Sequence, residues 1–200
     1  MSAQTRFETL LASARVLVDH TPALSSFFVI PSALDFDARE PVPRPALEHL
    51  CKETYDVAEA AGELVANVNA VAPYAEWRLS YTTDEVGQKM LDTYAWFELL
   101  GPKGHFRTAD ARWYIGYWGA GNYYPWHEHE AEEIYYIAAG SGRFAREGEE
   151  DVVLGPGDTL VMSPWQSHAM WTEDSGILCF VAWRGEGLGG VPMISKGSMA

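Results

Sequence analysis

The chain has few cysteines, few basic residues and no long apolar run. Cys51 falls in a helical pattern and Cys179 in an apolar strand, so we expect two buried free thiols, as in a reducing compartment. The 14 basic residues face 28 acidic ones, and the formal net charge of −14 argues against nucleic acid or an anionic membrane as a partner. The first residues lack the basic and then apolar pattern of a secretory signal, so we expect a cytoplasmic protein without a membrane partner.

The sequence does contain enough apolar material for one sizeable core. Hydrophobic residues make up 48% of the chain, and eight of them are tryptophans. A chain of 200 residues fits one domain, or one domain with an extension. Because the apolar pattern changes partway along the chain, we expect one compact unit with a helical portion over residues 1–105 and a β-barrel over residues 106–200.

The first portion carries apolar residues at helical spacing. These stripes predict helices over residues 4–18 and 45–72, and the proline-containing residues 23–44 between them should be mostly loop. A third helix is predicted over residues 82–97, because a Thr-x-x-Glu capping box opens it and a Gly-Pro pair follows it. The helical portion should either cap the barrel or form the surface of a homodimer.

From about residue 112 the apolar residues alternate with other residues, and aromatic residues become frequent. Short runs separated by turn residues are typical of an antiparallel barrel or sandwich. The runs are RWYIGYW, IYYIAAG, GRFARE, DVVLGPGDTLVMS, HAMWT and ILCFVAW. The expected fold class is therefore mainly β with a helical N-terminal portion.

The most informative stretch is GNYYPWHEHEAEEIYYIAAG, residues 121–140. His127 and His129 are separated by one residue, and alternate side chains of a strand share a face, so both rings can reach one point. Glu133 adds a carboxylate after three more residues. Neutral imidazoles and a carboxylate around one point suit a divalent transition metal. The alternative is a solvated acidic turn, because most charge runs are only that.

This spacing resembles the first signature motif of the cupins, small β-barrels that hold a metal in their mouths. The second cupin motif is matched by GPGDTLVMSPWQSH, residues 155–168, whose last residue is one more candidate ligand. Two details depart from the family pattern, since Trp165 lies near a position where glycine is usual and Thr172 stands where asparagine often occurs. The resemblance implies a double-stranded β-helix of the jelly-roll type. It also implies four metal ligands: His127, His129, Glu133 and His168.

The strand after Glu133 brings a tyrosine next to the expected metal. If Glu133 points into the barrel, Tyr135 also points in and Tyr136 points out. A phenol has a pKa of about 10, but a divalent cation favours its ionised form, so Tyr135 could ligate the metal or act as a general base. The alternative is that Tyr135 only fills the barrel. Trp183, on the last strand, is either a wall for a small cationic group or a core residue.

A more specific resemblance rests on YYPWHEHEAEEIYY and a single distal histidine, in a tryptophan-rich barrel behind a helical half of this length. This combination looks like the cupin-type dimethylsulfoniopropionate (DMSP) lyases. The resemblance implies a carbon–sulfur lyase that cleaves a small zwitterion, DMSP, into dimethyl sulfide and acrylate with one divalent metal ion. It implies Tyr135 as the favoured base and a role for Tyr124 in catalysis or substrate binding. Iron(II) and zinc are the metals expected first, with manganese, cobalt and nickel as alternatives.

Two other functions would use the same ligands. An iron(II)-dependent cupin dioxygenase acting on a small organic acid needs two open positions on the metal, for oxygen and substrate. A non-catalytic cupin that binds a small molecule needs the barrel but no turnover. The cupin motif alone does not decide between them, because one fold hosts many reactions.

Overall fold

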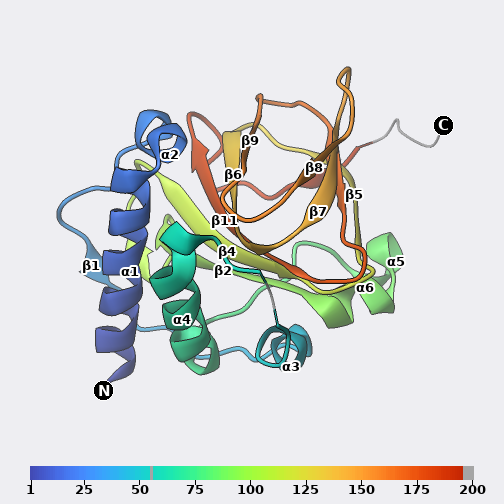
Figure 1. Ribbon diagram of the computed structural model, residues 1–200. Helices are drawn as coiled ribbons and strands as arrows, with labels where there is room; N and C mark the ends of the chain where they lie inside the picture. Colours follow the sequence, from blue (N-terminus) through green and yellow to red (C-terminus); the bar gives the residue numbers. More distant parts are fainter. Residues whose placement is uncertain (55, 196–200) are drawn as a thin grey trace.

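Two β-sheets and several helices make up the computed structural model, which describes residues 1–54 and 56–195 (Figure 1). The large sheet has the strand order β1-β3-β2-β4-β11-β6-β9, and the small sheet has the order β12-β5-β10-β7-β8. The strands of the large sheet are β1 (Asp35–Phe36), β2 (Tyr94–Gly101), β3 (Phe106–Arg107), β4 (Arg112–Trp118), β6 (Glu132–Gly140), β9 (Thr159–Met162) and β11 (Ile177–Arg184). Those of the small sheet are β5 (Tyr123–Glu128), β7 (Gly142–Arg146), β8 (Val152–Leu154), β10 (His168–Trp171) and β12 (Met193–Ile194).

The helices precede most of the strands in the chain, and α1 and α4 lie side by side against the large sheet (Figure 1). The α-helices are α1 (Ala3–His20), α2 (Pro22–Phe27), α3 (Ala46–Leu50), α4 (Gly62–Val71), α5 (Thr83–Val86) and α6 (Gln88–Thr93). Two short 3₁₀ helices, η1 (Glu59–Ala61) and η2 (Ala72–Tyr74), flank α4. Among the described residues, none of these helices has the length and apolar character that crossing a membrane requires.

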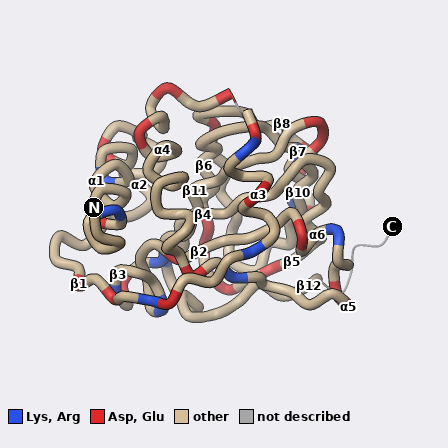
Figure 2. The backbone as a smooth tube through the Cα atoms, turned by 90° about the horizontal axis from the view of Figure 1, so that it is seen from below, with Lys and Arg blue, Asp and Glu red and all other residues tan. Residues whose placement is uncertain are grey.

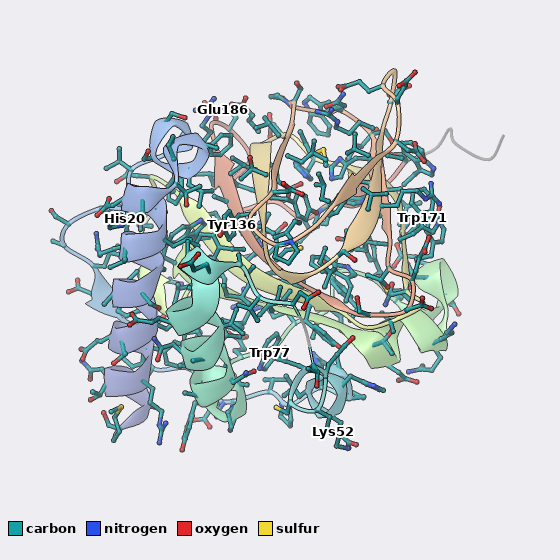
Figure 3. The ribbon with its side chains drawn as sticks, viewed as in Figure 1. His20, Lys52, Trp77, Tyr136, Trp171 and Glu186 are labelled. Atoms are coloured by element: carbon teal, nitrogen blue, oxygen red, sulfur yellow. The ribbon has the colours of Figure 1, made fainter. Side chains whose placement is uncertain are left out.

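The strands β2, β4, β11 and β6 of the large sheet are buried on both faces, so they contribute to two separate cores. Tyr136 belongs to the core between this sheet and the helices, and Figure 3 shows it on the helical side. Tyr135, its neighbour on β6, belongs to the core between the two sheets. Strand alternation also sends Phe180 of β11 to the first core and Val181 to the second. The inward phase expected for Tyr135 is therefore confirmed.

Much of the expected secondary structure is present. α1 covers the predicted helix 4–18, and each of the six predicted apolar runs contains at least one strand. The capping box at Thr82 and Glu85 forms, with the Thr82 N–H donating to Glu85 Oε2 at 2.8 Å. The expected loop over residues 23–44 holds most of α2 and the short strand β1. The mainly β fold with a helical N-terminal portion is thus confirmed.

The prediction of one long helix over residues 45–72 was wrong. The chain forms α3 and α4 instead, and the backbone between them pairs with the end of β6. Asp56 O accepts a hydrogen bond from Gly140 N at 2.9 Å, and Ala58 N donates one to Ala138 O at 3.0 Å. These hydrogen bonds to a strand take the place of helical ones, which spacing along the chain could not reveal.

The predicted helix over residues 82–97 was wrong at its C-terminal end. Gly87 has a φ of +79°, which interrupts the helix between α5 and α6, and residues from Tyr94 onward form β2. All eight residues of β2 are buried. A short run buried on both faces has no alternation to distinguish a strand from a helix.

β2 precedes residue 105, yet it pairs with β4 in the large sheet. The helical portion and the barrel therefore share a sheet, and a division at residue 105 stays a prediction. Both cysteines are free, but the expectation of two buried thiols was half wrong, since Cys179 is buried and Cys51 is exposed. Figure 2 shows acidic positions around the whole molecule, with fewer basic positions among them.

His105, in the turn before β3, should make the stability of the fold sensitive to acid. Its ring is buried and stacks on Phe7 with 3.9 Å between ring centroids. Burial, and next the charge of Arg39, lower the pKa of His105 from 6.5 to about 4. Between these two pH values the unfolded chain binds a proton that the folded protein does not. The free energy of unfolding should therefore fall by roughly 3 kcal/mol as the pH drops through this range.

Urea unfolding at several pH values between about 7 and about 4 measures this effect. His105→Gln removes the titrating ring, so its free energy of unfolding should fall less steeply with acid than that of the unmodified protein. The carboxylates change the free energy of unfolding with pH equally in both proteins, so their contribution cancels when the two pH dependences are subtracted. Equal slopes for the two proteins would contradict the prediction.

Candidate metal centre and active site

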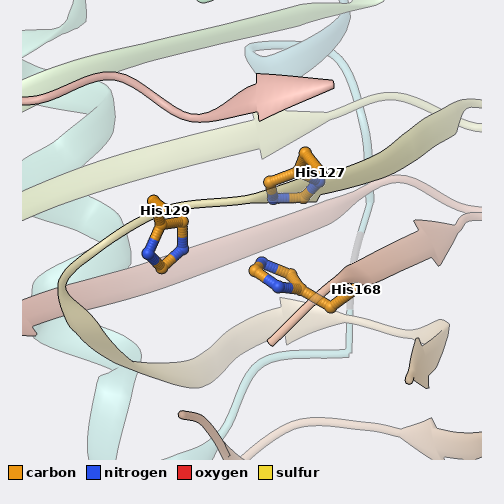
Figure 4. A group of neighbouring side chains, drawn as sticks. All are labelled: His127, His129 and His168. Carbon is orange, nitrogen blue, oxygen red and sulfur yellow. The ribbon is translucent and has the colours of Figure 1, made fainter. Parts of the chain in front are cut away.

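Three buried histidines and a buried glutamate meet between the two sheets. His127, near the end of β5, pairs directly with His168, the first residue of β10. His129 follows β5, and Glu133 is the second residue of β6. Figure 4 shows the three imidazole rings turned toward one another, and one ligand atom of each lies within 4.8 Å of the others. The two sequence motifs thus converge on one place.

Each of the three histidines is held by a main-chain carbonyl group through Nδ1. The pairs are His127 with Pro125 O at 2.8 Å, His129 with Ala131 O at 2.9 Å, and His168 with Gln166 O at 2.8 Å. A carbonyl oxygen only accepts, so each Nδ1 carries the proton and donates it. The neutral ring then has its lone pair on Nε2, an arrangement typical of metal-ligating histidines.

Glu133 joins this group from the large sheet. Its Oε2 lies 3.1 Å from His129 Nε2 and 3.2 Å from His168 Nε2. Burial by itself raises the pKa of Glu133, and positive charge on the adjacent His129 and His168 would outweigh burial and hold this pKa well below its usual range. Burial lowers the pKa of His127, and the adjacent His168 lowers it further, so the His127 ring is neutral at neutral pH.

The donor set fits a divalent transition metal. His168 Nε2 is buried without a hydrogen bond, although a carboxylate oxygen lies 3.2 Å away. With the proton on Nδ1, this contact brings a nitrogen lone pair against an oxygen lone pair, which is unfavourable unless a positive charge lies close by. Imidazole nitrogens and a carboxylate oxygen are the ligands that zinc, iron(II) and related ions use. The three-histidine group can therefore bind a metal ion.

The second oxygen of Glu133 has two other partners. Tyr114 donates its hydroxyl proton to Glu133 Oε1 at 2.7 Å, and Trp183 donates its indole N–H to the same atom at 2.6 Å. The sequence reasoning missed Tyr114. Alternation in RWYIGYW puts Tyr114 and Arg112 on one face of β4, but alternation alone does not say which face turns inward.

Both candidate bases lie in the interior core. The ring centroid of Tyr124 is 4.3 Å from that of His127, and the centroid of Tyr135 is 6.5 Å from that of His168. Burial raises the pKa of Tyr135 well above its usual value, and the charge of Glu133 raises it further. Burial, and next the neighbouring Tyr81, raise the pKa of Tyr124 well above its usual value. Each phenol therefore keeps its proton unless a positive charge lies close to it.

Aromatic residues from outside the predicted motifs surround Tyr124. The ring centroids of Tyr81, Tyr94 and Trp118 lie 5.7, 5.3 and 5.3 Å from that of Tyr124. The hydroxyl oxygens of Tyr81 and Tyr94 are each 3.5 Å from Tyr124 Oη. Sequence reasoning gave these two tyrosines no role in the site, because both fall in the N-terminal portion over residues 1–105, which was expected to lie outside the barrel. Residues that precede the predicted barrel thus line its interior.

Trp165 occupies a strained position beside the histidines. It has a φ of 60°, the left-handed region, and its N–H donates to His129 O at 2.8 Å. A non-glycine residue costs roughly 1–2 kcal/mol in this conformation. The strained turn at Trp165 therefore helps to hold the backbone of His129.

Two facing sheets that are antiparallel except for the β2–β3 pair, with a three-histidine group and a glutamate between them, form a cupin: a double-stranded β-helix barrel of the jelly-roll type. Comparison with known proteins identifies the family. The profile of the dimethylsulfoniopropionate lyases matches residues 27–179. This chain belongs to the DMSP lyase family, whose members are carbon–sulfur lyases.

Individual relatives cover nearly the whole chain. The DMSP lyase DddQ of Ruegeria pomeroyi is 35% identical over 181 residues, which are 90% of this chain and 90% of the relative. The crystal structure of that DddQ superposes with a TM-score of 0.92 and 33% identity, over 97% of this chain and 99% of the other. A chain from the crystal structures of the DMSP lyases RdDddP and RnDddQII gives a TM-score of 0.95 and 37% identity, over 98% of this chain and 100% of the other.

Proposed function

We propose that this protein cleaves DMSP into dimethyl sulfide and acrylate at a divalent metal ion. The proposed ligands are His127, His129, His168 and Glu133. The observation that carries the proposal is the convergence of these four buried side chains beside buried tyrosines, in a chain of the DMSP lyase family. The lyase DddQ, which is similar over 90% of this chain, is named for the same substrate.

The proposed reaction is a β-elimination in which all atoms are accounted for. A base removes one proton from the carbon next to the substrate carboxylate, and the electron pair of that C–H bond forms the double bond of acrylate. The C–S bond breaks, and its electron pair leaves with dimethyl sulfide. A bound divalent ion supplies a Lewis acid that withdraws charge from the carboxylate and makes the adjacent C–H more acidic. Iron(II) and zinc are proposed first, and manganese, cobalt and nickel also suit a reaction without a redox step.

Tyr135 is the proposed base. It lies on the inward face of β6, two residues after Glu133 and near the His168 ring. A general base must reach the proton that it removes within hydrogen-bond distance, and positive charge near a buried phenol lowers its pKa toward a useful range. Direct ligation by Tyr135 in place of another ligand is the second role proposed for this hydroxyl. Tyr124, against the His127 ring, is the other candidate for the base and a proposed substrate contact.

The interior aromatic residues suit the cationic end of this zwitterion. Tyr81, Tyr94, Trp118 and Tyr124 are all buried and close to one another. A cation over an aromatic face gains about 0.5 to 2 kcal/mol, and the gain grows as water is excluded. We place the sulfonium group among these rings and the carboxylate at the three-histidine group, which orients the substrate between them.

An anaerobic assay tests the proposed function. Metal-loaded protein mixed with DMSP should release dimethyl sulfide and acrylate in equal amounts without oxygen, measured by gas and liquid chromatography. Dialysis against a chelator should abolish the release, and adding back the metal should restore it. Turnover of a small organic acid only in the presence of oxygen would instead indicate the dioxygenase. Binding of DMSP without any product would indicate the non-catalytic cupin.

A further inference from the structure

Resting on the metal ligands proposed above, we infer that Tyr114 and Trp183 are positioning residues that hold Glu133. Their two hydrogen bonds to Oε1, at 2.7 and 2.6 Å, leave only Oε2 turned toward the histidines. Glu133 would thus offer a bound metal ion one oxygen, and its carboxylate cannot rotate without breaking both hydrogen bonds. The orientation of a metal-ligating carboxylate is generally set by such outer hydrogen bonds.

The residues that hold Glu133 lie on neighbouring strands of the large sheet. Trp183 on β11 is paired with Arg112 of β4 on one side and with Glu133 of β6 on the other. Directly paired residues project from the same face of a sheet, so these three side chains form one row across the barrel interior. Tyr114, two residues after Arg112 on β4, projects from this face as well and reaches the same carboxylate oxygen.

Arg112 packs against the rings of both Tyr114 and Trp183. Its guanidinium carbon lies 4.6 Å from the ring centroid of Trp183 and 5.6 Å from that of Tyr114. Arg112 is buried, its Nε donates to Glu98 Oε2 at 3.1 Å, and another guanidinium nitrogen donates to Gly190 O at 2.8 Å. These two hydrogen bonds hold the buried guanidinium group, and its positive charge attracts both aromatic faces.

Trp183 has little surface left for a substrate. Its N–H is bonded to Glu133, and its ring stacks on His129 with 4.3 Å between centroids. Arg112 contacts the indole from β4, on the side opposite the strand that carries Glu133. The positioning role is an alternative to the cation-binding wall that the sequence offered for Trp183, and the two roles differ in what a substitution would change.

Tyr114→Phe tests the inference because it removes one hydroxyl and keeps the ring. We expect the dissociation constant for Co²⁺ or Zn²⁺, measured by competition with a chromophoric chelator, to rise about 10- to 100-fold. The visible absorption spectrum of the Co²⁺ protein should change, because the carboxylate can then rotate or bind through both oxygens. The matched control is Tyr117→Phe on the same strand, whose hydroxyl donates to Glu53 at 2.5 Å, away from the site. It should leave the metal affinity and the spectrum unchanged.

An unchanged metal affinity and spectrum in Tyr114→Phe would overturn the inference, even if the unmodified protein cleaves DMSP. If the unmodified protein binds metal but releases no dimethyl sulfide, the proposed function is wrong. The metal affinity of Tyr114→Phe still tests the positioning role in that case. An unmodified protein that binds no metal overturns both.

Trp183→Phe separates the two roles of the indole. Loss of the N–H to Glu133 should weaken metal binding by a similar factor and leave the KM for DMSP, measured at saturating metal, within about twofold. A large rise in KM with unchanged metal affinity would show that Trp183 contacts the substrate, and it would overturn the positioning role.

Discussion

Replacing Tyr135 by phenylalanine should slow DMSP cleavage by at least about 10² to 10⁴, the typical contribution of a general base. The substitution keeps the ring in the interior core and removes only the hydroxyl, so the loss of packing should be small. Metal should be retained through the three histidines, which have their own main-chain hydrogen bonds. Initial rates of dimethyl sulfide release, combined with elemental analysis of the purified variant, measure both effects.

Tyr136→Phe is the matched control, because Tyr136 is the next residue on β6 and packs against the helices. It should cleave DMSP at nearly the unmodified rate. If Tyr135→Phe keeps near-normal turnover while Tyr124→Phe abolishes it, the base is Tyr124. Near-normal turnover in both variants would remove the tyrosine base from the mechanism.

Replacing His168 or His129 by alanine should lower metal content and turnover together. Each substitution removes an Nε2 that lies 3.2 or 3.1 Å from Glu133 Oε2, and a methyl group offers no ligand. The loss of activity should exceed the 10- to 100-fold that removing an outer-shell partner typically costs. The barrel core lies mostly in other residues, so the circular dichroism spectrum should stay close to that of the unmodified protein.

His49→Ala serves as the control, since His49 is exposed on α3, outside the barrel interior. It should keep full metal content and turnover. Full metal occupancy in both His129→Ala and His168→Ala, measured by elemental analysis, would show that the ion binds elsewhere.

Strand signals were readable along the sequence because the barrel runs are short, rich in aromatic and branched residues, and separated by turn residues. In β6, a period of two put Glu133 and Tyr135 on one face and Tyr136 on the other, and the two cores have this arrangement. Helix signals were less reliable where tertiary hydrogen bonds competed. Residues 56–58 pair with β6, and residues 94–101 enter the large sheet, although their apolar spacing also suits a helix.

The sequence by itself determined which side chains are available for a metal site, because the spacing of His127, His129 and Glu133 already limits where they can point. It also determined the mainly β fold, because short apolar runs separated by turn residues are typical of a barrel or sandwich. Only the tertiary structure decided what surrounds this group. Pairing of β4, β11 and β6 brings Tyr114 and Trp183 to one oxygen of Glu133. Tyr81 and Tyr94, which precede the predicted barrel in the sequence, contact the hydroxyl group of Tyr124. Contacts between strands distant in sequence depend on register and on which face turns inward, and neither quantity is written in the local pattern of residues.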